Sequence, residues 1–216
     1  FDLPIPALQT TFRFDVGGAW EGCLKAFFGN QLRPKSATDQ AVYTVRLRHP
    51  ISGRGVTLAD RGDAGCTVNM PLRSLLRAAL RSTAQVALPQ SNSIGLFEAF
   101  VGVLRLGFFE PLEAIAAERG FALLHAATLA MPSGEALLLV APTKGGKSTV
   151  AATLAGRGFA LHGDNYAFFD GTTVFTVPEC RRLGPPRRLS PSFYAKGVNP
   201  PPTPCQLPVA SVVVLA

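Results

Sequence analysis

Cysteine is scarce in this sequence, and the few cysteines are widely separated. They are Cys23, Cys66, Cys180 and Cys205, and no two have the Cys-x-x-Cys spacing of a zinc site or redox pair. A small secreted domain that depends on disulfides has a much denser set of cysteines. We therefore expect reduced, partly buried thiols, as in a cytoplasmic protein, and neither a disulfide framework nor a zinc site.

The sequence also lacks a long apolar run. Ala136–Val140 and Val209–Ala216 are far shorter than the roughly 20 residues that a membrane-spanning helix needs. No signal peptide is visible at the start, so we expect a cytoplasmic location and no membrane partner. The chain begins without Met, and Val209–Ala216 has the pattern of a buried strand at the very end. We therefore expect that the natural protein is longer.

Charged residues are few as well. They make up 16% of the 216 residues, whereas apolar residues make up 47%. This balance argues against a mainly disordered chain and allows a sizeable core. The formal net charge is +7. Such a basic excess suits an anionic partner, whether nucleotide phosphates, an acidic peptide or a nucleic acid, and does not choose among them.

Arginine recurs at four-residue spacing on one face of a helix that we expect at Pro71–Ser82. The arginines are Arg73, Arg77 and Arg81. A nucleic-acid surface of this kind would carry aromatic residues between the basic ones, and here there are none. We therefore interpret the stripe as a solvated helix face, and nucleic acid is not an expected ligand.

The first half of the chain predicts a small α+β region. Alternating apolar and polar residues predict strands, and apolar residues at helical spacing predict helices. The strands are expected at Thr10–Val16, Ala41–Leu47 and Gly55–Ala59, and the helices at Ala19–Phe28, Pro71–Ser82 and Ser93–Leu106. We assign residues 1–110 to an accessory region that binds the acceptor or covers the core.

From residue 111 onward the pattern becomes that of an α/β core, which we assign to residues 111–216. A short helix at Pro111–Arg119 leads into it, and Asp170-Gly171 has the pattern of a hairpin turn. After Pro178 the chain is rich in Pro and Arg and is expected to form a loop. The other expected elements are strands at Phe121–Ala130, interrupted by His125, and at Ala136–Val140, Phe159–Leu161, Tyr166–Phe169 and Thr173–Val177, and a helix at Lys147–Arg157.

A glycine-rich turn joins the strand Ala136–Val140 to the helix that follows it. Strand, turn and helix in this order, with Lys-Ser at the helix start, are the context of a P-loop. Backbone N–H groups of the turn and the helix N-terminus bind phosphate oxygens, Lys147 reaches the β- and γ-phosphates, and the Ser148 hydroxyl contacts Mg²⁺. We expect ATP and Mg²⁺ as cofactors. The expected binding residues are Ala141, Pro142, Thr143, Lys144, Gly145, Gly146, Lys147, Ser148 and Thr149.

The loop departs from the usual GxxxxGK[ST] pattern at its first position, which is Ala141. Loss of that glycine makes the turn sterically tighter but removes no group that binds phosphate. Lys144 is an extra cation, which either faces solvent or adds a second phosphate contact. A chance Gly-Gly-Lys-Ser in an unrelated turn is disfavoured, because strand, turn and helix all fall where a P-loop requires them.

Phosphoryl transfer also needs an acidic group near the phosphates, and Asp164 is the first candidate. It follows the short strand Phe159–Leu161 and lies sixteen residues after Ser148. At the carboxyl end of a strand beside the P-loop, its carboxylate could accept a proton from an attacking hydroxyl. From spacing alone, a loop aspartate that caps a turn or pairs with a surface arginine is equally compatible. We interpret His162 as a polar residue that satisfies a local hydrogen bond.

A histidine on the preceding strand, the P-loop, Arg-Gly, a short strand and then an acid follow one another along the chain. The segments are Leu124–Ala127, Ala141–Thr149 and Arg157–Asn165. This order resembles the HPr kinase/phosphorylase family, especially the smaller HPr-kinase-like proteins found with ribosomal-peptide pathways. The resemblance covers about residues 121–180 and implies a P-loop kinase core with a mixed sheet and helices.

The resemblance implies a serine kinase that acts on a protein or peptide. Lys147 carries over as a phosphate contact, Ser148 as a Mg²⁺ contact, and Asp164 as the base that activates the serine hydroxyl. His125 matches a histidine near the family's active site, although from the sequence alone a packed core histidine is as compatible. The HPr kinases form closed assemblies, so a homo-oligomer is a further expectation.

Two positions depart from the family's pattern or match it weakly. Asn165 stands where the family has a second acid, and an amide ligates a metal weakly without neutralising its charge. Glu179 is a weak match to a glutamate that helps to hold the metal. The nearby arginines fit either a clamp for phosphate or an acidic acceptor, or a solvated basic loop. They are Arg181, Arg182, Arg187 and Arg188.

Three functions stay open at this point. The first, which we favour, is an ATP-dependent kinase that phosphorylates a serine of a protein or peptide. The second is a P-loop kinase of a small molecule. The third is a regulatory or recruiting subunit that binds nucleotide without transferring phosphate, which Asn165 in place of an acid would favour.

Overall fold

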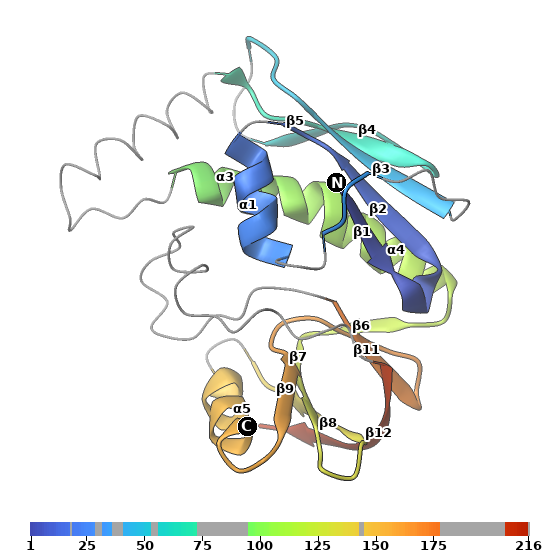
Figure 1. The fold of residues 1–216 in the computed structure, drawn as a ribbon, viewed down its shortest axis with the longest axis vertical. Coiled ribbons are helices and arrows are strands. Elements are labelled where there is room, and N and C mark those ends of the chain that lie inside the picture. The colour runs from blue at the N-terminus through green and yellow to red at the C-terminus, as the bar shows by residue number, and fades with distance from the viewer. Residues whose placement is uncertain are drawn as a thin grey trace, which may run out of the picture. The chain divides into compact units, whose positions relative to one another are not determined.

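The computed structural model describes residues 1–17, 19–28, 32–35, 41–52, 56–72, 95–142, 145–177 and 206–215. They form a mixed α/β protein with two mixed sheets and few helices. The chain divides into two compact units (Figure 1), which are Phe1–Leu112 and the described residues from Glu113 onward. Within the described ranges, no helix has the length and apolar character needed to cross a membrane.

The first unit contains a five-stranded sheet in the order β1-β2-β3-β5-β4. Its three central strands run parallel to one another, and each edge strand is antiparallel to its neighbour. The strands are β1 (Asp2–Ile5), β2 (Thr10–Asp15), β3 (Ala41–Arg48), β4 (Thr57–Gly62) and β5 (Gly65–Asn69). The carboxyl ends of β2 and β3 therefore lie at the same edge of the sheet.

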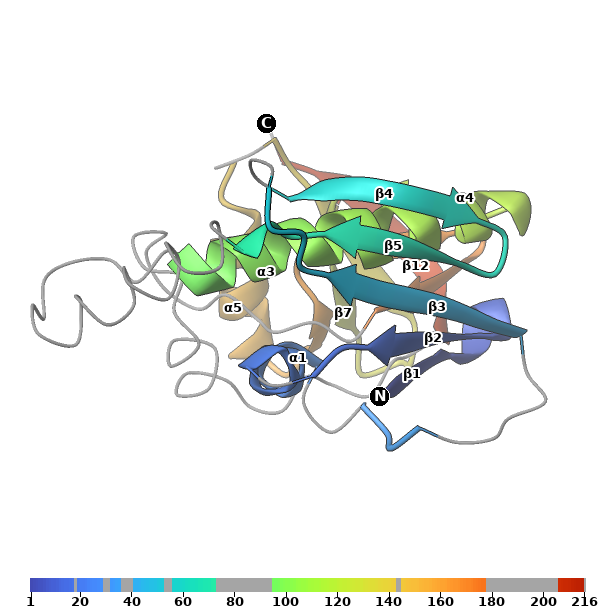
Figure 2. The ribbon, with the colours of Figure 1, turned by 90° about the horizontal axis from the view of Figure 1, so that it is seen from above.

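Helices α1 (Ala19–Phe28) and α3 (Gly95–Leu104) cover one face of this sheet. Figure 2 shows α3 passing behind the strands. Aromatic side chains fill the space between sheet and helices. The ring of Phe108 is central, because it meets Phe12 edge-on at 4.8 Å and Phe28 at 5.2 Å between ring centroids. Edge-to-face contacts of this kind add to the stability that burial alone supplies.

The prediction of two separate helices at Ser93–Leu106 and Pro111–Arg119 is wrong at their junction. A π-helical turn, η3 (Arg105–Phe109), joins α3 directly to α4 (Glu110–Glu118). Gly107 explains the tight packing of this turn against the sheet, because a Cβ there would lie 2.7 Å from Cγ1 of Val45. In this π-helical turn both Gly107 and the next residue, Phe108, are buried.

The other predictions for the first unit have mixed outcomes. The strands at β2 and β3 and the helix α1 are confirmed. The strand expected at Gly55–Ala59 is instead β4, which extends to Gly62, and the short strands β1 and β5 were not predicted. The arginine-bearing helix expected at Pro71–Ser82 lies almost entirely outside the described residues.

The second unit contains a seven-stranded sheet in the order β6-β10-β11-β12-β8-β7-β9. Its strands are β6 (Ala122–Leu124), β7 (Ala126–Ala130), β8 (Ala136–Val140), β9 (Ala160–Gly163), β10 (Ala167–Phe169), β11 (Thr173–Thr176) and β12 (Gln206–Val214). The expected strand Phe121–Ala130 is broken at His125, because β6 pairs with β10 whereas β7 pairs with β8 and β9. The sheet therefore curves back on itself, as Figure 1 shows.

Both faces of this sheet are packed. Leu129, Leu139 and Leu161 on one face contact Ala151 of helix α5 (Lys147–Ala155). Ala126, Ala136, Leu138, Ala167 and Val174 form a second cluster. Alternate residues of β7 and β8 thus supply two cores, which fixes the register of these strands, because a slip by one residue would exchange the two sets.

Two further predictions can be compared with this sheet. The hairpin at Asp170-Gly171 is confirmed, with β10 and β11 antiparallel on either side. The expected strand Val209–Ala216 is present as part of β12, but the expectation that it is buried is wrong: none of the residues of β12 is buried, and Val214 is 72% accessible. Within the described residues, β12 pairs with β11 only over Gln206–Pro208. From Val209 onward, the neighbour of β12 is β8.

The β4–β5 hairpin yields a stability prediction. Gly65→Ala should lower the free energy of unfolding by about 2–3 kcal/mol, because its Cβ would lie 2.3 Å from the Thr44 carbonyl oxygen. Gly62→Ala, in the same hairpin, is the matched control, since nothing lies within 4 Å of its Cβ position. Urea unfolding followed by the fluorescence of Trp20 measures both. Equal stability of the two variants would contradict the packing described for Gly65.

Candidate functional site

The topology of the second unit gathers the chemistry-bearing residues at one edge of its sheet. β8 runs parallel to β12 and antiparallel to β7, and β7 runs antiparallel to β9. The carboxyl ends of β8 and β9 and the start of β7 therefore lie at the same edge. Ala141 follows β8, Asp164 follows β9, and His125 precedes β7. Long-range strand pairing thus brings three separate sequence motifs to one place.

The glycine-rich turn after β8 is tight. The N–H group of Gly145 donates a hydrogen bond to the carbonyl oxygen of Pro142 at 2.8 Å. Gly146, the N-cap of α5, has φ of 82°, a left-handed conformation that favours glycine. Thr143 and Lys144 lie outside the described residues. The turn delivers the chain into α5 with Lys147 as the first helical residue.

The start of α5 has the geometry of an anion site. The first hydrogen bond of its ladder runs from the Val150 N–H group to the Gly146 carbonyl oxygen at 2.9 Å. The N–H groups of Lys147, Ser148 and Thr149 therefore precede the ladder and point out of the helix N-terminus. The helix dipole adds positive potential there. The side chains of Ser148 and Thr149 are exposed beside these groups.

Lys147 and Asp164 form a buried ion pair across this edge. The Nζ atom of Lys147 donates to the Asp164 backbone carbonyl oxygen and, at 3.1 Å, to its Oδ1 atom. Each side chain is only 7% accessible. A buried ion pair is tolerated when additional hydrogen bonds satisfy the charges, and here the backbone carbonyl supplies one. The partner of Asp164 in the structure is therefore Lys147, and not the surface arginine that one interpretation of the sequence allowed.

His125 lies in the electrostatic field of this pair. Its pKa is lowered from the ordinary value of 6.5, first by partial desolvation and second by the positive charge of Lys147. The negative charge of Asp164 acts in the opposite direction and is the smallest of the three effects. The imidazole is therefore neutral at neutral pH. Although the residue is exposed, it belongs to the same charged edge as the other two groups.

The expected metal ligands are only partly described. Ser148 is exposed at the start of α5, and Asn165 is half-buried next to Asp164, whereas Glu179 and the arginines that follow it lie outside the described residues. Within the described residues, no three His, Cys, Asp or Glu side chains gather as metal ligands. Mg²⁺ commonly takes one or two protein ligands and completes its shell with phosphate oxygens and water. Neither the Ser148 hydroxyl nor the Asn165 amide is a carboxylate, so each is a weaker ligand than Mg²⁺ usually takes.

Comparisons with protein-family models and with curated proteins each gave no match. The reasoning about function therefore depends on the geometry of the site and on the motifs in the sequence. Sequence reasoning identified Lys147, Asp164 and His125 separately but did not predict that the lysine and aspartate pair. It also missed a hollow in the first unit beside Trp20. The available signal was the Gly17-Gly18 turn between a strand and a helix.

The charged edge makes a prediction about His125. NMR titration of its imidazole should give a pKa below 6.5, which rises in Lys147→Met and falls further in Asp164→Asn. Because the folded state binds this proton less readily than the unfolded chain does, the residue lowers the free energy of unfolding as the pH falls below 6.5. The NMR signals of the other two histidines are assigned by their loss in His49→Gln and His162→Gln. If the pKa of His125 stays the same in both charge variants, His125 does not lie near the ion pair.

Proposed function

We propose that the second unit is a P-loop kinase core, resembling the HPr kinase catalytic domain, that transfers the γ-phosphate of ATP to a serine of a protein or peptide. The observation that carries the proposal is the convergence of the P-loop helix, Lys147 and Asp164 at one sheet edge. Phosphoryl transfer needs positioning and charge stabilisation more than covalent chemistry. The start of α5 and Lys147 supply these, and Asp164 supplies an adjacent base.

In this proposal the ion pair rearranges when nucleotide binds. Triphosphate oxygens carry more negative charge than one carboxylate, so they draw Lys147 away from Asp164 toward the β- and γ-phosphates. Asp164 is then left without its cation at the same edge. Its carboxylate accepts the proton of the serine hydroxyl, the serine oxygen bonds to the γ-phosphorus, the bond to the β-phosphate oxygen breaks, and ADP leaves.

Two more groups complete the proposed site. Ser148 and Asn165 would be the residues to hold Mg²⁺, which would supply neutralisation of the charge on the phosphate oxygens. His125, neutral at this edge, donates a hydrogen bond to the transferred group. A positive charge on this imidazole is disfavoured because Lys147 already carries one nearby, which agrees with the lowered pKa of His125. These roles match the positions at which the family resemblance places the same residues.

One observation favours a second candidate, a nucleotide-binding subunit without transfer. Asn165 is an amide where a second acid would strengthen the metal site. The two candidates agree on nucleotide binding and differ on transfer.

The first test is nucleotide binding, measured by calorimetry with ATP and Mg²⁺. Lys147→Met should weaken ATP binding at least about tenfold, because it removes a charge-assisted contact to phosphate. Arg119→Met is the matched control, since it removes one exposed positive charge of the same unit outside the loop. Because Lys147→Met leaves Asp164 buried without its cation, the variant Lys147→Met with Asp164→Asn checks that the fold is retained. Equal binding by wild type and both loop variants would exclude the P-loop assignment.

The second test is transfer from γ-labelled ATP to a pool of serine-containing peptides. Asp164→Asn should lower the rate about a hundredfold or more and leave ATP affinity within a few fold, because it removes the base but not the loop. Asp170→Asn, at an exposed turn, is the control. Asn165→Asp should raise the rate or the affinity for Mg²⁺. Nucleotide binding with no transfer by wild type or by Asn165→Asp would support the non-transferring subunit instead.

A further inference from the structure

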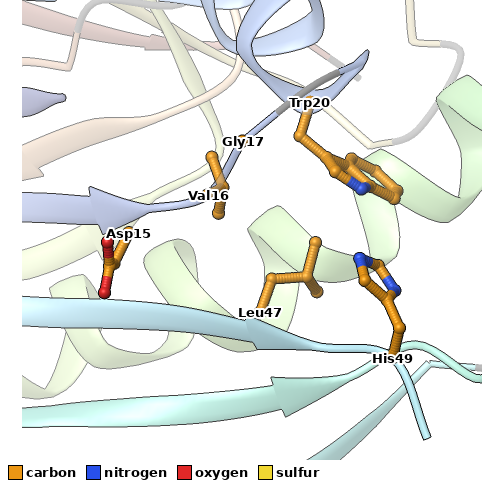
Figure 3. A pocket seen from close by; sticks show the side chains of 6 residues that line it. All are labelled: Asp15, Val16, Gly17, Trp20, Leu47 and His49. Atoms are coloured by element: carbon orange, nitrogen blue, oxygen red, sulfur yellow. The ribbon is translucent and has the colours of Figure 1, made fainter.

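A hollow of about 470 Å³ opens in the first unit, beside the start of α1. It lies where the parallel strands β2 and β3 end, and ligands of α/β sheets bind outside the carboxyl ends of such strands. Its walls are side chains of both strand ends and of α1, namely Asp15, Val16, Gly17, Trp20, Leu47 and His49 (Figure 3). Nothing in the nucleotide chemistry of the second unit accounts for it.

One end of the hollow is a fixed pair of rings. The rings of Trp20 and His49 lie within 17° of parallel, with centroids 6.3 Å apart. Trp20 is only 4% accessible and stacks on Phe100 behind it, so its position is set by the core. His49 Nδ1 lies 3.1 Å from the carbonyl oxygen of Met70, which holds the imidazole in place. Such a preformed aromatic wall suits a flat group.

The polar groups that line the hollow are two acceptors, on Asp15 and His49, and one donor, the indole N–H group of Trp20 (Figure 3). Since the Met70 carbonyl can only accept, Nδ1 of His49 carries the proton, and in the neutral ring Nε2 is left as an acceptor. The carboxylate of Asp15 is exposed, and no ion pair joins it to its cross-strand neighbour Arg46 or to any other described residue. The hollow therefore suits a ligand with a positive charge at its Asp15 end and, at the ring end, an N–H donor for His49 and an acceptor for the indole N–H group of Trp20.

The order of these groups along the hollow defines the ligand further. Figure 3 shows Asp15 at one end and the Trp20–His49 ring pair at the other, with Val16 and Leu47 between them. A ligand that matches this order has a cation at Asp15, an aliphatic stem along Val16 and Leu47, and a flat N–H group at the two rings. An arginine residue in a peptide has this order, with its guanidinium, its methylenes and its planar peptide group.

We propose that this hollow binds an arginine side chain of a peptide, with the guanidinium on Asp15 and the adjoining peptide N–H on His49 Nε2. Arginine fits better than lysine because a guanidinium pairs with a carboxylate through two parallel hydrogen bonds. A free arginine molecule shares the guanidinium and stem, but it has no planar peptide group to lie against the rings. The proposal is independent of nucleotide binding or transfer by the second unit.

Trp20 is the sole tryptophan of the chain, so its fluorescence and its single indole N–H resonance report on this hollow directly. The full chain, without nucleotide, is titrated with N-acetyl-arginine methylamide, with the matching citrulline compound and with free arginine. We expect a saturable change with the arginine compound and binding at least about tenfold weaker for citrulline, which keeps the shape and loses the charge. Weaker binding of free arginine would identify a peptide as the source, and equal or tighter binding would identify the amino acid.

Two variants test the assigned roles. Asp15→Asn should weaken the arginine compound about tenfold, whereas Asp63→Asn, an exposed acid in the β4–β5 turn, should leave it unchanged. His49→Asn keeps an N–H donor for Met70 and loses the ring, and it should also weaken binding. Equal binding of citrulline and arginine, an unchanged affinity in Asp15→Asn, or no saturable change with either arginine ligand would overturn the proposal.

Discussion

The buried ion pair between Lys147 and Asp164 is the interaction on which the second unit's functional edge depends. It joins the first residue of α5 to the residue after β9. Removal of one partner from a buried pair costs about 3–5 kcal/mol, because the other charge is left desolvated. The glycine turn before α5 places Lys147 at this edge, and Ala151 of the helix packs with Leu129, Leu139 and Leu161 of the strands.

Local signals allowed β8, the turn and α5 to be predicted, because each depends on residues close in sequence. An apolar run, two glycines and Lys-Ser are sufficient for that. The pairing of Lys147 with Asp164 is different, since it depends on β7 lying between β8 and β9, and no local pattern encodes that neighbourhood. The sequence shows His125 as a polar residue in an apolar run. It does not show that the chain changes partner strands there, from β10 to β8 and β9.

The same reason explains what was missed in the first unit. The π-helical turn depends on Gly107 meeting Val45 on a distant strand, and helical periodicity alone cannot reveal that contact. The hollow beside Trp20 arises because β2 and β3 run parallel and end together. In both units the groups that can bind a ligand lie at the carboxyl ends of parallel strands, where loops are free to carry polar side chains while the strands bury their apolar ones.

Charge explains why a basic chain can present sites of opposite preference. The net charge of +7 favours anions in general, yet what a ligand meets is set by the nearest fixed groups, because water and salt screen distant ones. At the start of α5 these groups are N–H donors and a lysine, and in the hollow beside Trp20 the one charged side chain of the described lining is the carboxylate of Asp15. Under the proposed function, nucleotide takes Lys147 from Asp164, so the base becomes available only when phosphate is present. Binding and activation of the base would then be a single event, and the buried pair would keep the base from acting without its substrate.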